Sequence, residues 1–395
     1  MSDLVIIGAG LTAATAIETL REQGFDAAIT LVGAEPRPPY ERPQLSKEML
    51  AGKEFSLRHD EQWYADHQVT LRLDVAVTAI DRDLRTVTLA DGSWLPYDQL
   101  LIATGASARI PDLPGVERAL PLRTKEDADA ILAGFKDASS LVTVGGGWIG
   151  LEVAAAARAA GLDVTVLEQA AKPLLTVLGD ELADYVVGVH ESHGVTIRTG
   201  VTVQGLSNDA VLTDAGEVPA DLVVLGVGAV PNDALARAAG LEVGERGGIV
   251  TNDHLETADP RIFAAGDVAL AEHLDYGPLR VEHWDNAIKQ GRLAARAILG
   301  QHVHYDWQPY FYTDQFEFSM EYVGHSAPHD EVVIRGDLKA STFIAYWLAP
   351  LSEGGDASQR TVTAAMNVGI WDVNEQLRAL VGTSVDPAEL TDLQG

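Results

Sequence analysis

Two glycine-rich turns in this 395-residue sequence have the spacing with which proteins hold the pyrophosphate of a dinucleotide. Small residues stand at the first, third and sixth positions of each turn: Gly8, Gly10 and Ala13 in one copy, and Gly145, Gly147 and Gly150 in the other. The first allows a tight turn, the second lets backbone amides approach the pyrophosphate, and the third lets a helix pack closely on a strand. The helix that follows directs the positive end of its dipole at the phosphates. The repeat therefore predicts two dinucleotide sites.

An acidic residue follows each turn where the ribose of a bound nucleotide needs one. Glu35 lies just beyond the apolar segment 28–32, and Glu168 directly follows segment 164–167, 23 residues after Gly145 and close to the spacing expected of such a carboxylate. The carboxylate accepts hydrogen bonds from ribose hydroxyls and repels a 2′-phosphate. No arginine stands beside Glu168 to reverse that preference, so we expect the second site to favour NADH over NADPH.

The sequence contains no cysteine, which excludes disulfides, thiolate metal sites, iron–sulfur ligation by this chain and a thiol redox relay. Two dinucleotides on one chain imply electron exchange between a resident and a visiting group. FAD as the resident and NADH as the exchangeable co-substrate is the simplest assignment, because a flavin accepts a hydride and releases single electrons. Without a thiol relay, the electrons must pass directly to a protein or a small molecule.

The elements that must position these residues occur in the same order in both halves. Each turn joins an apolar strand to a helix and then a second strand: strand 4–7, a helix from Leu11 towards Gly24 and strand 28–32, then strand 141–144, helix 151–160 and strand 164–167. Residues 95–105 and 218–228 also resemble each other, with Pro, Asp and an apolar run ending in glycine. Alternating segments before each of them, 70–80 with 86–95 and 195–206 with 210–218, predict antiparallel excursions. The alternative to a duplication is a tandem of unrelated Rossmann units.

From about residue 305 the sequence becomes aromatic and strand-like, with a polar turn at 352–360 and a helix near 373–381. This predicts a third, α+β domain. The fold class is therefore α/β, with two Rossmann-like dinucleotide-binding domains of glutathione-reductase type and a C-terminal α+β domain. The predicted domains are a discontinuous FAD-binding domain at 1–109 and 245–316, an NAD-binding domain at 110–244, and a C-terminal domain at 317–395.

Charge and hydropathy limit the partners of the chain. With 28 Lys and Arg against 58 Asp and Glu, the net charge of −30 disfavours nucleic acid and anionic membranes. No apolar run is long enough to span a bilayer, and the start of the chain lacks a signal-peptide pattern, so we expect a cytoplasmic protein. His190 and His193 share a predicted helix, and His302 and His304 a possible strand, but no third ligand is evident, and we expect no metal site.

The chain resembles FAD-dependent pyridine nucleotide oxidoreductases, and among them the ferredoxin and rubredoxin reductases of bacterial oxygenase systems, the putidaredoxin-reductase-like components. The resemblance covers nearly the whole chain and is carried by these motifs: the first glycine turn with Glu35, residues 39–47 (PYERPQLSK), residues 103–105 (ATG), residues 145–152 (GGGWIGLE), residues 262–267 (IFAAGD), residues 281–287 (VEHWDNA) and residues 309–315 (PYFYTDQ). It implies an NADH-dependent reductase that passes electrons through FAD to a small iron–sulfur ferredoxin serving an oxygenase or cytochrome P450, as a monomer or homodimer. The alternatives are reduction of a quinone or other small acceptor, and an NADH-sensing flavoprotein resembling apoptosis-inducing factor.

The resemblance also implies roles for single residues. Lys47 would place a cation near the flavin ring, and Glu152 would pair with it; both are assigned to catalysis. Asp267 would bind a ribityl hydroxyl, and Trp284 would lie near the pyrimidine edge of the flavin. The other positions implied in cofactor binding are Thr12, Glu35, Arg42, Val77, Ala103, Thr104, Gly105, Arg123, Ile149, Gly228 and Tyr312.

Three of these assignments have plain structural alternatives. Lys47 and Glu152 could form an ordinary ion pair or be unrelated surface charges, and Arg123 could be a solvated arginine at a helix start. Tyr312 stands where many relatives carry tryptophan, so it could simply pack in the core of the third domain. The substitution leaves an aromatic wall in place but puts a tryptophan-specific electron exit in doubt.

Overall fold

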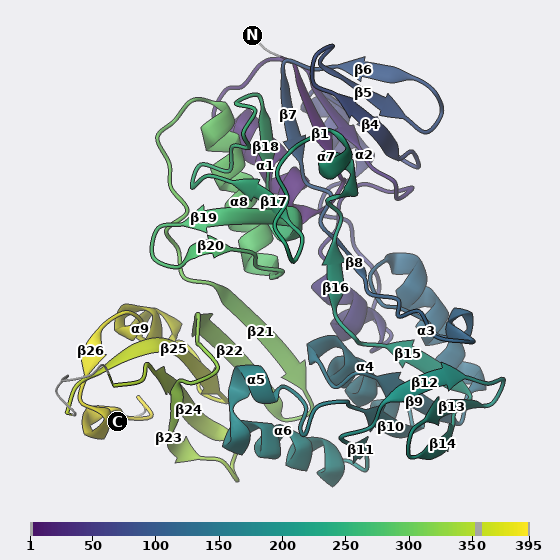
Figure 1. Cartoon of the computed structure of the whole chain (residues 1–395), viewed down its shortest axis with the longest axis vertical. Helices are drawn as coiled ribbons and strands as arrows, with labels where there is room; N and C mark the ends of the chain where they lie inside the picture. Colours follow the sequence, from purple (N-terminus) through teal and green to yellow (C-terminus); the bar gives the residue numbers. More distant parts are fainter. Residues whose placement is uncertain (1–2, 352–357, 394–395) are drawn as a thin grey trace. The chain divides into compact units, whose positions relative to one another are not determined.

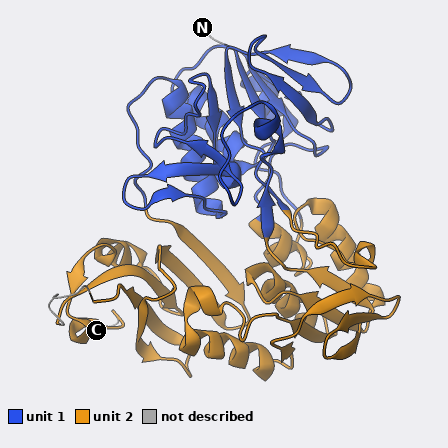
Figure 2. Cartoon of the chain, viewed as in Figure 1, with its two compact units in different colours: residues 1–42, 55–107, 229–307 blue, residues 43–54, 108–228, 308–395 orange. Residues whose placement is uncertain are grey.

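The structure is a computed structural model that describes residues 3–351 and 358–393, and it forms two compact units (Figure 2). Unit 1 comprises residues 1–42, 55–107 and 229–307, and unit 2 comprises residues 43–54, 108–228 and 308–395. The chain thus changes unit at five points along the sequence. This division groups residues differently from the three predicted domains, whose boundaries stay a prediction.

Unit 1 is built on a five-stranded parallel sheet in the order β18-β7-β1-β2-β3 (Figure 1). Its strands are β1 (Leu4–Ile7), β2 (Ile29–Val32), β3 (Val69–Arg72), β7 (Gln99–Ile102) and β18 (Ile262–Ala264). Helices α1 (Leu11–Glu22) and α8 (Trp284–Ile298) pack closely against each other. Gly291 permits this approach, because a Cβ there would lie 2.5 Å from the carbonyl oxygen of Thr12.

Smaller elements complete unit 1. A three-stranded antiparallel sheet is formed by β4 (Val77–Asp81), β5 (Thr86–Leu89) and β6 (Trp94–Pro96), with a turn at Asp91–Gly92 between the last two. The remaining elements are α2 (Glu61–Asp66), α7 (Ala234–Ala238), β16 (Ala229–Pro231), β17 (Ile249–Thr251), the short helix Gly266–Val268, β19 (Ala269–His273) and β20 (Gly277–Leu279).

Unit 2 contains a second parallel sheet, ordered β11-β10-β9-β15. Its strands are β9 (Ser140–Val144), β10 (Asp163–Leu167), β11 (Thr196–Arg198) and β15 (Leu222–Leu225), and its helices are α3 (Lys125–Asp137), α4 (Trp148–Ala159), α5 (Leu175–Leu178), α6 (Asp180–Ser192) and the π-helix Leu45–Met49. An antiparallel sheet follows, made of β12 (Val203–Leu206), β13 (Ala210–Thr213) and β14 (Gly216–Pro219). A further short element of unit 2 is the 3₁₀ helix Val116–Arg118, whereas β8 (Ala106–Ala108) begins in unit 1 and ends at the first residue of this segment of unit 2.

The C-terminal part of unit 2 is an antiparallel sheet in the order β21-β22-β25-β24-β23, with β26 paired to β25 (Figure 1). Its elements are β21 (Tyr310–Gln315), β22 (Phe318–Gly324), β23 (Glu331–Asp337), β24 (Thr342–Leu348), β25 (Arg360–Val368), α9 (Asn374–Leu380), β26 (Ser384–Val385) and the 3₁₀ helix Pro387–Glu389. The predicted fold class is confirmed, including the helix near residues 373–381. Most of the predicted polar turn at 352–360 lies outside the described residues.

The predicted antiparallel excursions are wrong in one respect, and in the same way in both halves. Each leading segment divides in two: β3 and β11 join the parallel sheets, and only β4 and β12 enter the antiparallel ones. Between the two parts lies a residue with left-handed backbone, Asp74 at φ +57° in the first half and Gly200 at φ +66° in the second. A left-handed residue interrupts a strand, and the chain leaves the sheet there.

Candidate active site

The first glycine turn forms a cradle at the start of α1. Gly8 has φ +104°, and a Cβ there would lie 2.2 Å from the carbonyl oxygen of Ala103, so only glycine fits. A Cβ on Gly10, by contrast, would meet no atom of the described chain within 4 Å. Ala13 is fully buried at the third position. The turn therefore leaves space in front of a helix N-terminus, which fits the pyrophosphate of a dinucleotide.

The second turn repeats this arrangement at the start of α4. Gly145 has φ +100°, and its Cβ would lie 2.5 Å from the carbonyl oxygen of Gly226. A Cβ on Gly147 would make only an ordinary 3.5 Å contact, whereas one on Gly150 would lie 2.1 Å from the carbonyl oxygen of Gly145. The first and third glycines are thus required by the fold, and the second leaves space for a ligand, as in the first copy.

Glu35 belongs to a charged cluster in unit 1 rather than standing alone. Its two carboxylate oxygens accept from Arg42, at 2.8 Å, and from the Tyr40 hydroxyl, at 2.6 Å. Burial opposes the charge on Arg42, but Tyr40, Glu35 and Asp267 outweigh it and raise the pKa of Arg42 above its ordinary value. The structure therefore brings three of the predicted residues, Glu35, Arg42 and Asp267, into one electrostatic neighbourhood.

Asp267 lies almost buried, at 9% exposure, in the short helix after β18. Thr12 adjoins this helix, because a Cβ on Gly266 would lie 2.5 Å from the Thr12 hydroxyl oxygen. The amide of Gly266 donates to Oε1 of Gln290, a fully buried residue of α8, at 2.7 Å. Sequence reasoning missed Gln290; its signal is a polar residue in the apolar stripe of an amphipathic helix.

The ATG segment at residues 103–105 is fixed by a second residue that sequence reasoning missed, Asn232. The side-chain amide nitrogen of Asn232 donates to the backbone carbonyl of Thr104 at 2.9 Å, and the Thr104 hydroxyl donates to the backbone carbonyl of Asn232 at 2.8 Å. The backbone amide of Asn232 also donates to the Gly105 carbonyl. Only the three-dimensional structure places Asn232 beside residues 103–105, because 128 positions separate it from Thr104.

Val77, another predicted residue of unit 1, begins β4 and packs on the apolar cluster around Val5 and Ile7.

Trp284 begins α8, and a series of paired charged side chains in unit 1 holds its indole ring. Its indole nitrogen donates to Glu41 at 2.9 Å, Glu41 accepts from Arg58 at 2.7 Å, and Arg58 also pairs with Glu18. Burial alone would raise the pKa of Glu18, but hydrogen bonds from Arg58 and His59 outweigh it, so this pKa lies below its ordinary value. The indole plane is therefore fixed by a charged partner and not by packing alone.

Lys47 and Glu152 form a nearly buried ion pair in unit 2, with the Lys47 ammonium 2.6 Å from Oε1 of Glu152. Their side chains are 13% and 6% exposed. The Lys47 nitrogen also lies 5.1 Å from the ring centre of Tyr312, within cation–π range, and 3.9 Å from Asp314. Lys47 and Glu152 are therefore not unrelated surface charges, and Tyr312 contacts Lys47. The role of Tyr312 in cofactor binding stays a prediction. Whether the pair is catalytic stays a prediction.

The other predicted residues of unit 2 lie around the second glycine turn or begin a helix. Glu168 accepts from the backbone amides of Gly146 and Ala170, each at 2.7 Å, so its carboxylate lies against the turn. Ile149 is 42% exposed at the start of α4, and Gly228 has φ +93°. Arg123 precedes α3, and its backbone amide donates to Asp127.

Replacing Glu168 with serine should lower the ratio of kcat/KM for NADH to kcat/KM for NADPH about tenfold or more. Glu168 lies against the second glycine turn, so we expect its carboxylate to repel the 2′-phosphate of NADPH bound there. Serine removes that repulsion while keeping a hydrogen-bonding group. The ratio of kcat/KM for the two nucleotides measures the effect. The control is Asp163→Ser, an exposed carboxylate at the start of β10, the strand that ends just before Glu168. An unchanged ratio would contradict this role for Glu168.

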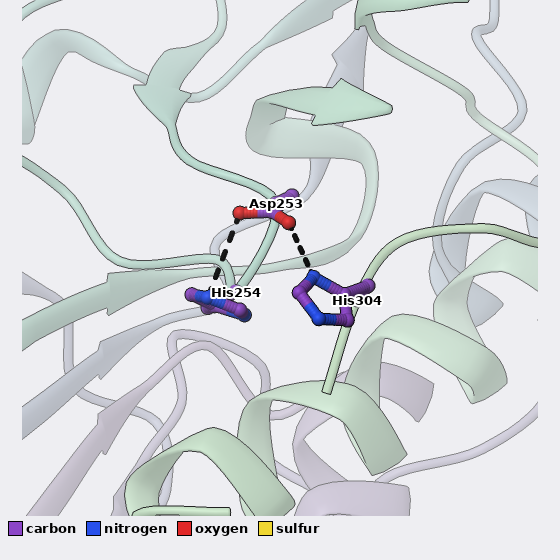
Figure 3. A group of neighbouring side chains, drawn as sticks. All are labelled: Asp253, His254 and His304. Atoms are coloured by element: carbon purple, nitrogen blue, oxygen red, sulfur yellow. Dashed lines mark hydrogen bonds and ion pairs between the residues drawn. The ribbon is translucent and has the colours of Figure 1, made fainter. Parts of the chain in front are cut away.

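The histidines need a correction. Residues 301–309 form no strand in the described chain, so His302 and His304 do not share a strand face. Instead His304 lies 2.5 Å from Asp253, and Asp253, His254 and His304 place one potential ligand atom each within 4.8 Å of one another (Figure 3). His254 also contacts the Val303 carbonyl. These contacts tie the turn after β17 to the segment before β21, and the absence of a metal site stays a prediction.

Comparison with known proteins agrees with this geometry. Residues 2–291 match the family described as pyridine nucleotide-disulphide oxidoreductase, and residues 310–393 match the reductase C-terminal family. Rhodocoxin reductase of Rhodococcus erythropolis is 40% identical over 86% of this chain and 82% of its own length. The ferredoxin–NAD(+) reductase component of the anthranilate 1,2-dioxygenase system of Burkholderia cepacia is 37% identical over 98% and 96%.

A solved structure matches over nearly the whole chain. The ferredoxin reductase for the CYP199A2 system of Rhodopseudomonas palustris superposes with a TM-score of 0.91 at 32% identity, covering 99% of this chain and 97% of the other. Among the described residues, no helix combines the length and the apolar character that crossing a membrane requires.

Proposed function

The chain belongs to the pyridine nucleotide-disulphide oxidoreductase family, and from this premise we propose that it is an NADH-dependent FAD reductase of a ferredoxin-type iron–sulfur protein. The observation that carries the proposal is the pair of dinucleotide cradles, each with an open second glycine, in a chain that has no cysteine. The family name refers to disulphides, but this chain lacks the thiols for that reaction. The matched relatives named as ferredoxin reductases support a protein acceptor instead.

Bound FAD would supply the redox chemistry, taking a hydride from NADH and releasing single electrons. The chain's own residues bind and orient. The Gly8–Ala13 turn and α1 would hold the pyrophosphate, with Glu35 and Arg42 at the adenosine end and Asp267 at the ribityl chain. In unit 2, the Gly145–Gly150 turn and Glu168 would hold NADH.

Lys47 is proposed as the catalytic cation. A fixed positive charge stabilises negative charge that develops as the flavin ring is reduced, and it does so most effectively where water is excluded. Glu152 balances the lysine in a nearly buried setting, where an unpaired charge would be costly. The pair is held on the π-helix Leu45–Met49 and α4, so two regular elements set the position of the ammonium group.

Rapid mixing of the FAD-loaded protein with NADH, followed by mixing with a candidate ferredoxin, tests the proposal. We expect fast bleaching of the flavin and then rapid reoxidation as the iron–sulfur protein is reduced. Quinones and dye acceptors serve as the comparison. Slow reoxidation by every ferredoxin with fast reoxidation by a quinone would overturn the protein acceptor, and a long-lived complex with NADH would favour a sensing role.

The docking surface for an acidic ferredoxin must be locally positive on this acidic chain. Two basic residues of the 39–47 motif, Arg42 and Lys47, are already paired with Glu35 and Glu152. Helix α8 retains exposed Arg292 and Arg296, with Lys289 half-buried beside Asp285. We therefore propose that α8 contributes the positive surface.

The double reversal Lys289→Glu with Arg292→Glu should slow ferredoxin reduction about tenfold or more at low salt and leave flavin reduction by NADH unchanged. Steering between surface charges acts mainly on association and is screened by salt, so the difference should shrink as ionic strength rises. Lys339→Glu, an exposed reversal on the loop after β23, is the control. Equal ferredoxin rates at low salt would exclude α8 as the docking face.

The proposed location is the cytoplasm, where NADH is available, and the proposed assembly is a monomer or a homodimer. Light scattering of the purified protein over a range of concentrations determines the assembly. Fractionation of cells that express the protein determines the location. A membrane-bound fraction that resists high salt would contradict the cytoplasmic assignment.

A further inference from the structure

Four polar side chains lie buried in a line inside unit 2, between α4 and α6. Their residues are 6% (Glu152), 1% (Thr313), 1% (Gln315) and 0% (His190) exposed. Thr313 and Gln315 are two positions apart on β21, so both side chains point to the same face of that strand. A buried polar group without a hydrogen bond is costly, so the pairing within such a line indicates what holds it in place.

Hydrogen bonds connect the four residues without a gap. The Nε2 atom of His190 lies 3.0 Å from Oε1 of Gln315, and Nε2 of Gln315 donates to the Thr313 hydroxyl at 3.1 Å. The Thr313 hydroxyl donates to Oε1 of Glu152 at 2.6 Å. This is the same carboxylate oxygen that accepts from Lys47. The line therefore ends on the acceptor of the proposed catalytic cation.

The chemistry of the groups fixes the direction of every bond. A hydroxyl has one hydrogen, and Thr313 uses it on the Glu152 carboxylate, so it can only accept from Gln315. Gln315 must then present its amide nitrogen to Thr313 and its oxygen to His190. That oxygen requires a donor, which places the hydrogen of His190 on Nε2. All hydrogens in the line point towards Glu152.

His190 is neutral in this arrangement. Burial lowers the pKa of His190, with a further lowering from His193, and these outweigh the opposing effects of Gln315 and Glu317. Its other ring nitrogen, Nδ1, is buried and makes no hydrogen bond within the described chain. A proton on Nδ1 would be buried without an acceptor, which keeps the hydrogen on Nε2.

Glu152 thereby receives three donors in a nearly buried position: Lys47 and Thr313 on Oε1, and Ser46, at 2.5 Å, on Oε2. Several donors aimed at a carboxylate hold it in one orientation. We propose that Thr313, Gln315 and His190 are positioning residues that orient the Glu152 carboxylate and, through it, the Lys47 ammonium group. This inference rests on the proposed function, in which Lys47 assists reduction of the flavin.

Thr313→Val removes the hydroxyl and keeps the shape of the side chain, whereas Thr313→Ser keeps the hydroxyl. In the FAD-loaded full chain, we expect Thr313→Val to lower the limiting rate of flavin reduction at saturating NADH about tenfold, the scale of a hydrogen bond to a charged group. FAD content and the NADH concentration for half-saturation should stay close to those of the unaltered protein. Thr313→Ser should recover most of the rate, which a purely packing role of the methyl group would not predict.

His190 tests the far end of the line in the same way. His190→Phe removes the donor, and His190→Gln offers an amide hydrogen near the place of Nε2. We expect the first to slow flavin reduction several-fold and the second to restore it. Combined with Thr313→Val, the His190→Phe change should add almost nothing, because the line is already interrupted at Thr313.

Several results would overturn the inference. These are an unchanged rate in Thr313→Val, an equal loss in Thr313→Val and Thr313→Ser, or additive effects in the double variant. If Thr313→Val does not fold, the His190 pair decides the matter with the same readout. Failure of the proposed function looks different: the unaltered protein would not reduce its flavin with NADH, or Lys47 variants would reduce it at the unaltered rate.

Discussion

Lys47→Ala is expected to slow reduction of the bound flavin by NADH by about a hundredfold to a thousandfold, with a much smaller loss of FAD content. Removing one group that stabilises developing charge in a water-poor site costs about 3–4 kcal/mol in the transition state. Lys47 is 13% exposed and contacts Glu152 and Tyr312, neither of which can supply a positive charge in its place. Stopped-flow absorbance measures the rate, and the absorbance of flavin released on denaturation measures the FAD content.

Two variants control for indirect effects. Lys53→Ala removes an exposed lysine from the same segment of unit 2 and should change nothing. Lys47→Met leaves Glu152 charged and without its ammonium partner, and breaking such a pair costs about 3–5 kcal/mol of stability. Lys47→Met with Glu152→Gln should therefore regain stability without regaining the rate. Recovery of the rate in that double variant would show that Lys47 acts only through folding.

Gly10→Ala is expected to yield a folded but nearly colourless protein. Gly10 has φ −104° and ψ −174°, a conformation that alanine adopts readily, and its added Cβ meets no atom of the described chain within 4 Å. The methyl group would instead occupy the space in which backbone amides approach the pyrophosphate. We expect FAD affinity to fall on the order of a hundredfold, about 2.7 kcal/mol.

Two glycines calibrate this result. Gly188→Ala lies within α6, where an added Cβ also meets no described atom within 4 Å, and should leave a yellow protein slightly more stable. Gly8→Ala should fail to fold, because its Cβ would lie 2.2 Å from a backbone oxygen in a left-handed turn. Thermal unfolding separates the three variants. A Gly10→Ala protein that purifies with a full complement of FAD would contradict the cradle.

The repeated architecture could be predicted from the sequence because local signals carry it. Glycine spacing, apolar runs and the acids at 35 and 168 all act within about 30 residues, and the parallel sheets followed them. The division of residues 70–80 and 195–206 could not be predicted, because alternating apolar residues fit a parallel edge strand as well as a hairpin. One left-handed residue, Asp74 or Gly200, decides where the chain changes sheet.

The supporting residues of the site were beyond sequence reasoning for a different reason. Asn232 and Thr313 are single polar residues whose partners lie 128 and 161 positions away in the sequence. Nothing local distinguishes such a residue from a solvated one. Gln290 differs, because it is a polar residue in the apolar stripe of α8, but that signal does not identify its partner Gly266. The charged anchors could be named from motifs, whereas the groups that orient them required the three-dimensional structure.

Of the five strands in the parallel sheet of unit 1, β18 comes last in the sequence and is therefore translated last. This order affects how the protein folds during synthesis. The glycine turn at Gly8 leaves the ribosome early, but Gly266, which lies beside Thr12 of that turn, is translated about 250 residues later, roughly 10–50 s at ~5–20 residues per second. Until then the nascent sheet presents the unpaired edge of β7. Flavin loading is therefore expected late in biosynthesis, after β18 has paired with the edge of β7.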